Sequence, residues 1–148
     1  MAINLNEDML YVPKVGRPTL TEGISYGFIA ITNNHIFYIP QMSQKMGGYT
    51  YIKVEQMDVS QFNDTDFWDV VPKLAKEAPS VTHADQFLCN MADEIPGSFK
   101  IPFASLQEVK IGFFAQFTVV TAEGKTRFSV GGKRKEIADF LKAKGYYS

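Results

Sequence analysis

The stretch from Ser98 to Gly145 constrains the fold of this chain most, because it combines several strand patterns with one closing helix. Phe99, Ile101 and Phe103 alternate with Lys100 and Pro102, which is the period-two pattern of a half-buried strand. A second strand pattern follows around Val109 and Ile111. The run from Phe113 to Val120 is apolar on both faces, which is typical of a central strand. These patterns predict an antiparallel β-sheet in the C-terminal part of the chain.

The end of this stretch predicts a hairpin and a helix. Glu123-Gly124 has the composition of a two-residue hairpin turn, after which Thr126 to Val130 returns as a strand. Gly131-Gly132 ends that strand. Lys133 to Lys144 then has apolar residues at helical spacing, and Gly145 follows where a helix C-cap is expected. The apolar positions of this helix are Ile137, Phe140 and Leu141.

A second hairpin is expected between Ile24 and Ile39. Asn33 and Asn34 occupy the centre of its two-residue loop, where asparagine tolerates the left-handed conformation that such turns require. The flanking runs are rich in Ile, Phe and Tyr, which favour strands. His35 follows the turn directly and is either an ordinary exposed histidine or an acid-base or ligand group.

Three of these segments together resemble a pleckstrin-homology-like domain, in particular its GRAM and bacterial PH branch. They are GFIAITNNHIFYIP (Gly27 to Pro40), FKIPFASLQEVKIG (Phe99 to Gly112) and the final hairpin with its helix. The resemblance implies a mainly β fold with added α-helices. It also implies a barrel of two roughly orthogonal antiparallel sheets that a C-terminal helix plugs at one end. For function it implies a binding module whose ligand is a protein or an anionic lipid headgroup.

The N-terminal segment, Met1 to Leu20, predicts a lead-in and a first strand. Pro13, Gly16 and Pro18 interrupt its pattern, so we expect an edge strand or an irregular approach. The resemblance places a lipid site near Lys14 and Arg17, because basic residues around the first hairpin bind inositol phosphates in lipid-binding PH domains. Two ordinary exposed bases are the alternative interpretation.

Residues 56–96 depart from the family pattern as an insertion between the fourth and fifth strands. Asp66 or Asp69 can cap a first helix. Thr82 and Asp85 have the spacing of a capping box for a second helix. The second helix carries one apolar stripe, formed by Ala84, Phe87, Leu88 and Met91. Such helices either pack on the barrel or dock a partner protein, and the candidate side chains for docking are Phe67, Trp68, Phe87 and Met91.

Charge is unevenly distributed although the net charge of the chain is −1. Between Glu55 and Gly97 there are nine acidic and two basic residues, and the rest of the chain has a net charge of +6. This pattern fits two solvated surfaces, or an acidic segment that lies over a basic face and competes with an anionic ligand. Charge alone also points to Lys133, Arg134 and Lys135, at the start of the final helix, as an anion site.

The sequence offers little for catalysis. Cys89, the single cysteine, lies on the second predicted helix, and His83 falls on a different face of that helix. His35 would reach Cys89 only through tertiary contacts. The sequence contains no paired-histidine metal motif, CxxC, phosphate-binding loop or Gly-x-Ser-x-Gly elbow, so no metal or cofactor is expected. An enzyme that uses His35 and Cys89 is therefore the most distant alternative.

The bulk properties predict one domain, residues 1–148, with a substantial core. The single cysteine and the absence of a signal-peptide pattern favour a cytoplasmic protein. A pI near 6.1 and the lack of a basic stripe with interleaved aromatic residues argue against nucleic-acid binding. The sequence therefore predicts a non-enzymatic binding or scaffolding module. Its expected partner is a protein, with peripheral contact to an anionic membrane as the alternative.

Overall fold

The computed structural model describes residues 3–19, 23–45, 48–51, 66–112 and 115–147. Within these ranges the chain is mainly β, with one connected antiparallel sheet and three α-helices. The strands are β1 (Leu10–Thr19), β2 (Gly23–Ile31), β3 (His35–Lys45), β4 (Gly48–Tyr51), β5 (Phe99–Pro102), β6 (Leu106–Ile111), β7 (Gln116–Thr121) and β8 (Gly124–Ser129). The helices are α1 (Val70–Glu77), α2 (Val81–Glu94) and α3 (Arg134–Ala143).

The strands follow the order β4-β3-β2-β1-β8-β7-β6, and β5 pairs with β3 outside this path. β4 and β5 share β3 by occupying different parts of it: β5 pairs with His35 to Tyr38, whereas β4 pairs with Met42 to Lys45. The β1–β8 contact, which includes the pair Gly16 and Ser129, joins the N-terminal strands to the C-terminal ones.

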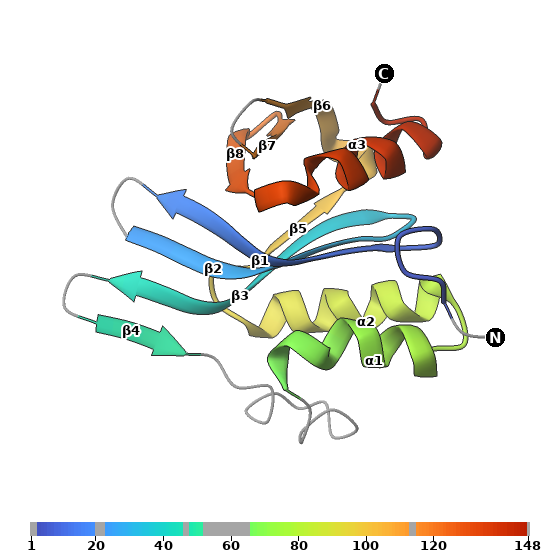
Figure 1. Cartoon of the computed structure of the whole chain (residues 1–148), viewed down its shortest axis with the longest axis horizontal. Helices are drawn as coiled ribbons and strands as arrows, with labels where there is room; N and C mark the ends of the chain where they lie inside the picture. The colour runs from blue at the N-terminus through green and yellow to red at the C-terminus, as the bar shows by residue number, and fades with distance from the viewer. Residues whose placement is uncertain (1–2, 20–22, 46–47, 52–65, 113–114, 148) are drawn as a thin grey trace.

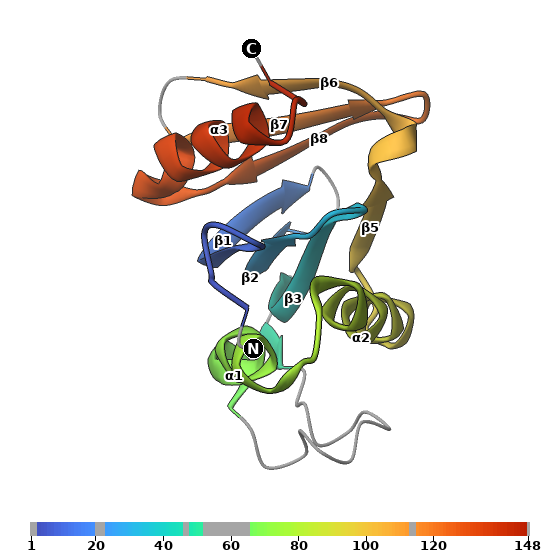
Figure 2. The same ribbon diagram turned by 90° about the vertical axis from the view of Figure 1, so that its right-hand side faces the viewer.

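The elements are arranged in three layers (Figures 1 and 2). β6, β7 and β8 form one layer together with α3, β1 to β3 form the middle layer, and α1 and α2 cover the far side of β1 to β3. The middle strands are therefore buried on both faces, which explains the unbroken buried runs Phe28–Ile31 and Ile36–Ile39.

Two hydrophobic cores fill the spaces between the layers. The inter-sheet core lies between the two β layers and α3, and it includes Leu10, Val12, Val15, Ile29, Ile31, Ile36, Tyr38, Phe117, Val119, Phe128, Ile137, Phe140 and Leu141. The helix-side core lies between β1 to β3 and the α1–α2 pair, and it includes Met9, Phe28, Ala30, Phe37, Ile39, Phe67, Val70, Val71, Leu74, Ala84, Phe87, Leu88 and Met91. The predicted apolar faces of α2 and α3 are confirmed by these contacts.

Several local predictions are confirmed. Thr32 N–H donates to His35 O, which leaves Asn33 and Asn34 as the two-residue loop between β2 and β3, although neither asparagine adopts the expected left-handed conformation. The Asp66 carboxylate accepts from Trp68 N–H at the start of the 3-10 helix η3 (Phe67–Asp69), which leads into α1, whereas Asp69, the N-cap residue of α1, makes no side-chain cap bond. Gly145 has φ of +84° directly after the C-cap of α3, as a glycine-terminated helix requires.

The first strand differs from its prediction. β1 is not an edge strand, because it lies between β2 and β8. The expected interruption is local: the register of β1 against β2 shifts between Val12 and Val15, and Lys14 adopts φ of +58°. Proline has no backbone N–H to donate to a neighbouring strand. A bulge at Pro13 and Lys14 takes this position out of the regular pairing, so β1 pairs with β2 both before and after the bulge.

Two turns also differ. The β7–β8 loop consists of Ala122 and Glu123, one position earlier than expected, because Gly124 already pairs with Thr121. The hairpin ends later than expected on its second strand, because β3 continues past Ile39 to Lys45. The insertion enters the fold between β4 and β5 as expected, although its residues 56–65 lie outside the described part of the chain.

Candidate functional site

Three side chains that can carry chemistry meet where the β2–β3 hairpin touches α2. His35 begins β3, while Asp85 and Cys89 are four residues apart on α2 and so share one helix face. His35 Nδ1 lies 2.9 Å from Asp85 Oδ1 and 3.1 Å from Oδ2. Cys89 Sγ lies 3.9 Å from both His35 Nδ1 and Asp85 Oδ2. We name His35, Asp85 and Cys89 the hairpin–helix cluster.

The hairpin turn fixes the carboxylate of this cluster. The Thr32 hydroxyl donates to Asp85 Oδ1 and accepts, at 3.3 Å each, from the backbone N–H groups of Asn34 and His35. Thr32 is fully buried and Asp85 is buried as well. Asp85 thus has two protein partners inside the fold, as a buried carboxylate requires.

The predicted capping box is wrong. Ser80 is the N-cap of α2, and its side chain accepts from His83 N–H at 3.1 Å. Asp85 lies further into the helix and is directed at the hairpin. The Thr-x-x-Asp spacing has the same appearance in sequence whether Asp85 caps the helix or faces a neighbouring strand. Only the tertiary contact distinguishes the two roles.

The cluster lacks the geometry of a thiol nucleophile. A base that activates a thiol needs a free ring nitrogen facing the sulfur, and its other nitrogen must be held by the orienting group. Here Asp85 and Cys89 both approach the same atom, His35 Nδ1. Burial raises the pKa of the Cys89 thiol, and the charge of Asp85 raises it further. Both effects disfavour the reactive thiolate.

The side chains predicted to dock a partner are mostly in the core. Phe67, Phe87 and Met91 are buried in the helix-side core, and Trp68 packs partly buried against it. The rings of Phe67 and Trp68 meet edge-on with their centroids 4.9 Å apart. This placement corresponds to the packing interpretation of the helical stripes, and it leaves the three buried side chains without an exposed surface for docking.

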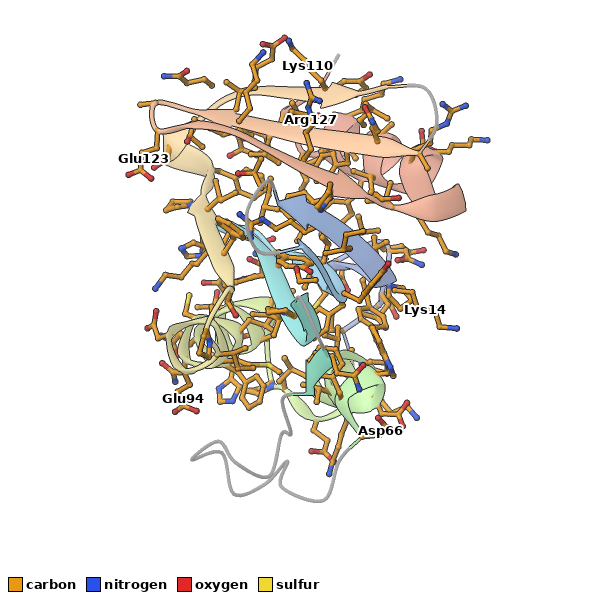
Figure 3. The ribbon with its side chains drawn as sticks, turned by 90° about the vertical axis from the view of Figure 1, so that its left-hand side faces the viewer. Lys14, Asp66, Glu94, Lys110, Glu123 and Arg127 are labelled. Atoms are coloured by element: carbon orange, nitrogen blue, oxygen red, sulfur yellow. The ribbon has the colours of Figure 1, made fainter. Side chains whose placement is uncertain are left out.

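Of the five candidate anion-binding residues, Arg17 is partly buried and the other four are exposed. The Arg17 guanidinium lies 4.2 Å from the ring centre of Phe99. Lys14 is exposed on the β1 bulge and points away from the sheet (Figure 3). The 3-10 helix η5 (Gly131–Lys133) contacts β1, because the antiparallel chains continue past the pair Gly16 and Ser129. Lys14 therefore lies on the same side of the fold as the exposed residues Lys133, Arg134 and Lys135.

A cleft of about 590 Å³ lies elsewhere, between β5 with its following turn and the β7–β8 hairpin. Its lining comes from two segments, residues 99–107 without Phe103, and residues 121–126. Glu123 at the hairpin tip and Lys14 project from opposite sides of the molecule (Figure 3). Sequence reasoning missed this cleft, since it depends on how far the hairpin extends past β5. None of the residues of the hairpin–helix cluster lines it.

Comparison of the chain with protein-family models, curated proteins and solved structures found no match. Among the helices in the described ranges, none combines the length and the hydrophobicity needed to cross a membrane. The function of the chain is therefore inferred from its sites.

Proposed function

We propose that this protein is a non-enzymatic binding module of pleckstrin-homology-like type that accepts an extended segment of a partner protein in the cleft between β5 and the β7–β8 hairpin. The strand order supports the fold assignment: the N-terminal strands and the β6 to β8 layer are joined through β1 and β8, and α3 packs into the core between them. The observation that carries the functional proposal is the cleft with strand edges along its walls.

Backbone groups on both walls of the cleft are available for pairing. Phe103 N–H donates to Asn34 O, and because hydrogen bonding alternates along a strand, the N–H and C=O of Lys100 point away from β3. On the other wall, Thr121 and Gly124 close the hairpin, so the backbone groups of Lys125 point away from β7. Within the described residues β5 pairs only with β3, and β8 pairs with β1 only at Ser129. An added strand would satisfy these edges.

The side chains of the cleft define the chemistry of the segment that fits it. Apolar groups come from Phe99, Ile101, Pro102, Ala104, Leu106 and Ala122. The charged groups are Lys100, Lys125 and Glu123, of which Lys100 already pairs with Asp93 at 3.1 Å. An extended apolar segment that carries a carboxylate to meet Lys125 matches this lining.

Filling the cleft should weaken peptide binding. Ala104 is exposed and lines the cleft, so Ala104→Trp places a large side chain in the position of the incoming segment. We expect a displayed library of random peptides to enrich binders on the wild-type protein, and those binders to lose at least about tenfold in affinity, or about 1.4 kcal/mol, on this variant. Enrichment and dissociation constants are the measurements.

The matched control is Ala143→Trp, which adds the same side chain to an exposed position on α3 outside the cleft. It should bind the selected peptides like the wild-type protein. Binders that are equally insensitive to both substitutions would place the binding surface elsewhere and contradict the proposal.

An anionic headgroup is the second candidate ligand. It is favoured by one observation: Lys14 and the bases of η5 and α3, which are far apart in sequence, lie on the same side of the fold. Arg134 Nη1 donates to Gly112 O at 3.1 Å, which holds its guanidinium beside the end of β6. Helices α1 and α2 cover the opposite face of β1 to β3, so their described residues leave this patch uncovered.

Charge reversal tests this second candidate. The double substitution Lys133→Glu and Lys135→Glu should weaken sedimentation with phosphatidylserine vesicles by more than about tenfold, since each base near a membrane surface contributes about 1 kcal/mol. Lys76→Glu with Lys110→Glu changes the net charge equally on other surfaces, and it should behave as the wild-type protein does. Wild-type protein that stays in the supernatant at low salt would contradict lipid binding.

A further inference from the structure

The hairpin–helix cluster has the composition of a transition-metal site. It offers one imidazole nitrogen, one thiol sulfur and one carboxylate oxygen, and these ligand atoms all lie within 4.8 Å of one another. Zinc binds these three types of ligand in proteins. Cysteine, histidine and aspartate are also supplied by two secondary elements, β3 and α2, so the cluster does not arise from neighbours in sequence alone.

The distances between the ligand atoms fit one small ion. Around a tetrahedral zinc with bonds of about 2.0–2.3 Å, neighbouring ligand atoms are roughly 3.3–3.8 Å apart. His35 Nδ1 and Asp85 Oδ2 are 3.1 Å apart, and Cys89 Sγ is 3.9 Å from each of them. Each separation is therefore within a few tenths of an ångström of the tetrahedral value, and small side-chain rotations would complete the geometry.

The surroundings also match a metal site. Carboxylates that bind metals are commonly held by a second hydrogen bond, and the Thr32 hydroxyl donates such a bond to Asp85 Oδ1. Oδ1 also lies 2.9 Å from His35 Nδ1, whereas Oδ2 is the carboxylate oxygen that lies near both the ring nitrogen, at 3.1 Å, and the sulfur, at 3.9 Å. His35 and Cys89 are only partly buried, which provides a route for the ion to enter.

We propose that His35 Nδ1, Asp85 Oδ2 and Cys89 Sγ bind one zinc ion, with a water molecule as the fourth ligand. Zinc would displace the thiol proton to solvent and bind the thiolate, and His35 would bind through Nδ1 as the tautomer that carries its proton on Nε2. The ion would connect the β2–β3 hairpin to α2 and so fasten the helical insertion to the middle sheet. This site is independent of the proposed peptide cleft, because the two share no residue.

Cobalt titration of the metal-depleted full-length protein tests the proposal. The wild-type protein should bind one equivalent of Co²⁺, with tetrahedral d–d absorption and a thiolate-to-cobalt charge-transfer band. Cys89→Ser should remove the charge-transfer band. His35→Gln, which keeps a polar group beside Asp85, should weaken binding by more than about 100-fold, since loss of an outer-shell partner alone costs 10–100-fold.

His83→Ala is the matched control, because it removes the other histidine of the chain, which is exposed on α2 away from Asp85. It should bind Co²⁺ like the wild-type protein. Circular dichroism of every variant in chelator verifies that it is folded, and zinc should raise the melting temperature of the wild-type and His83→Ala proteins only. A folded wild-type protein that binds no Co²⁺, or binding that survives both His35→Gln and Cys89→Ser, would overturn the proposal.

Discussion

A protein in which a short Gly/Ser linker replaces residues 56–96 is expected not to fold. α1 and α2 form one side of the helix-side core, so their removal would expose Phe28, Phe37 and Ile39, which are all 0% exposed in the intact protein. Each large side chain stabilises the fold by roughly 1.5–3 kcal/mol when it is buried. The stabilisation lost from both sides of this core would therefore exceed the free energy of unfolding of a typical domain, which is about 5–15 kcal/mol. Circular dichroism and thermal unfolding measure the outcome.

Single substitutions in the helix-side core should also destabilise the protein, by smaller amounts. Leu88 is fully buried in the helix-side core, so Leu88→Ala should destabilise the protein by about 2–5 kcal/mol. The matched control is Gln86→Ala, two residues earlier on the exposed side of α2, which should change stability by less than about 0.5 kcal/mol. A linker variant that retains a cooperative unfolding transition would contradict the three-layer fold.

Gly27→Ala is expected to cause the largest loss of stability among single substitutions at glycine. A Cβ at Gly27 would lie 1.9 Å from Ile39 O and 2.6 Å from Pro40 Cα, both of them backbone atoms of the neighbouring strand. The β2–β3 register shifts between Tyr26 and Gly27, so the two backbones meet closely at this bulge. A loss of about 3 kcal/mol or more follows, because backbone atoms cannot move aside as a side chain can.

Gly16→Ala is the control for this prediction. The nearest atom to its added Cβ would be Tyr26 Cε1 at 3.5 Å, which is an ordinary contact. Chemical denaturation should therefore separate the two variants clearly, and the melting temperature of Gly27→Ala should fall by roughly 10 °C. Equal stability of the two variants would contradict the close contact between the β2 and β3 backbones at Gly27.

Local sequence signals predicted the elements well. Three features could be predicted from residues that are close together in sequence. They are the Asn33-Asn34 turn, the apolar stripe of α2 and the glycine after α3. The position of β1 could not be predicted in this way. A bulge at Pro13 and Lys14 lets an interrupted segment lie between two strands, and its partner β8 is more than a hundred residues away in sequence.

The two proposed sites show the same limit. His35 is separated from Asp85 by 50 residues and from Cys89 by 54, so no spacing rule connects them. The sequence identified His35 and Cys89 as groups that can carry chemistry, but it predicted that Asp85 caps a helix. The cleft depends on the relative positions of β5 and the β7–β8 hairpin, which are set by packing between layers. The apolar stripes of the helices left packing on the barrel and docking of a partner open, and the structure places their side chains in the helix-side core.

Amide hydrogen exchange with a peptide selected on the wild-type protein tests the proposed function most directly. If the peptide adds a strand in the cleft, the backbone N–H groups of Lys100 and Lys125 should gain protection on binding, because both now point away from their paired strands. The amides of α2 and η5 should exchange unchanged. Unchanged exchange at Lys100 and Lys125, with new protection at other positions, would contradict strand addition in this cleft.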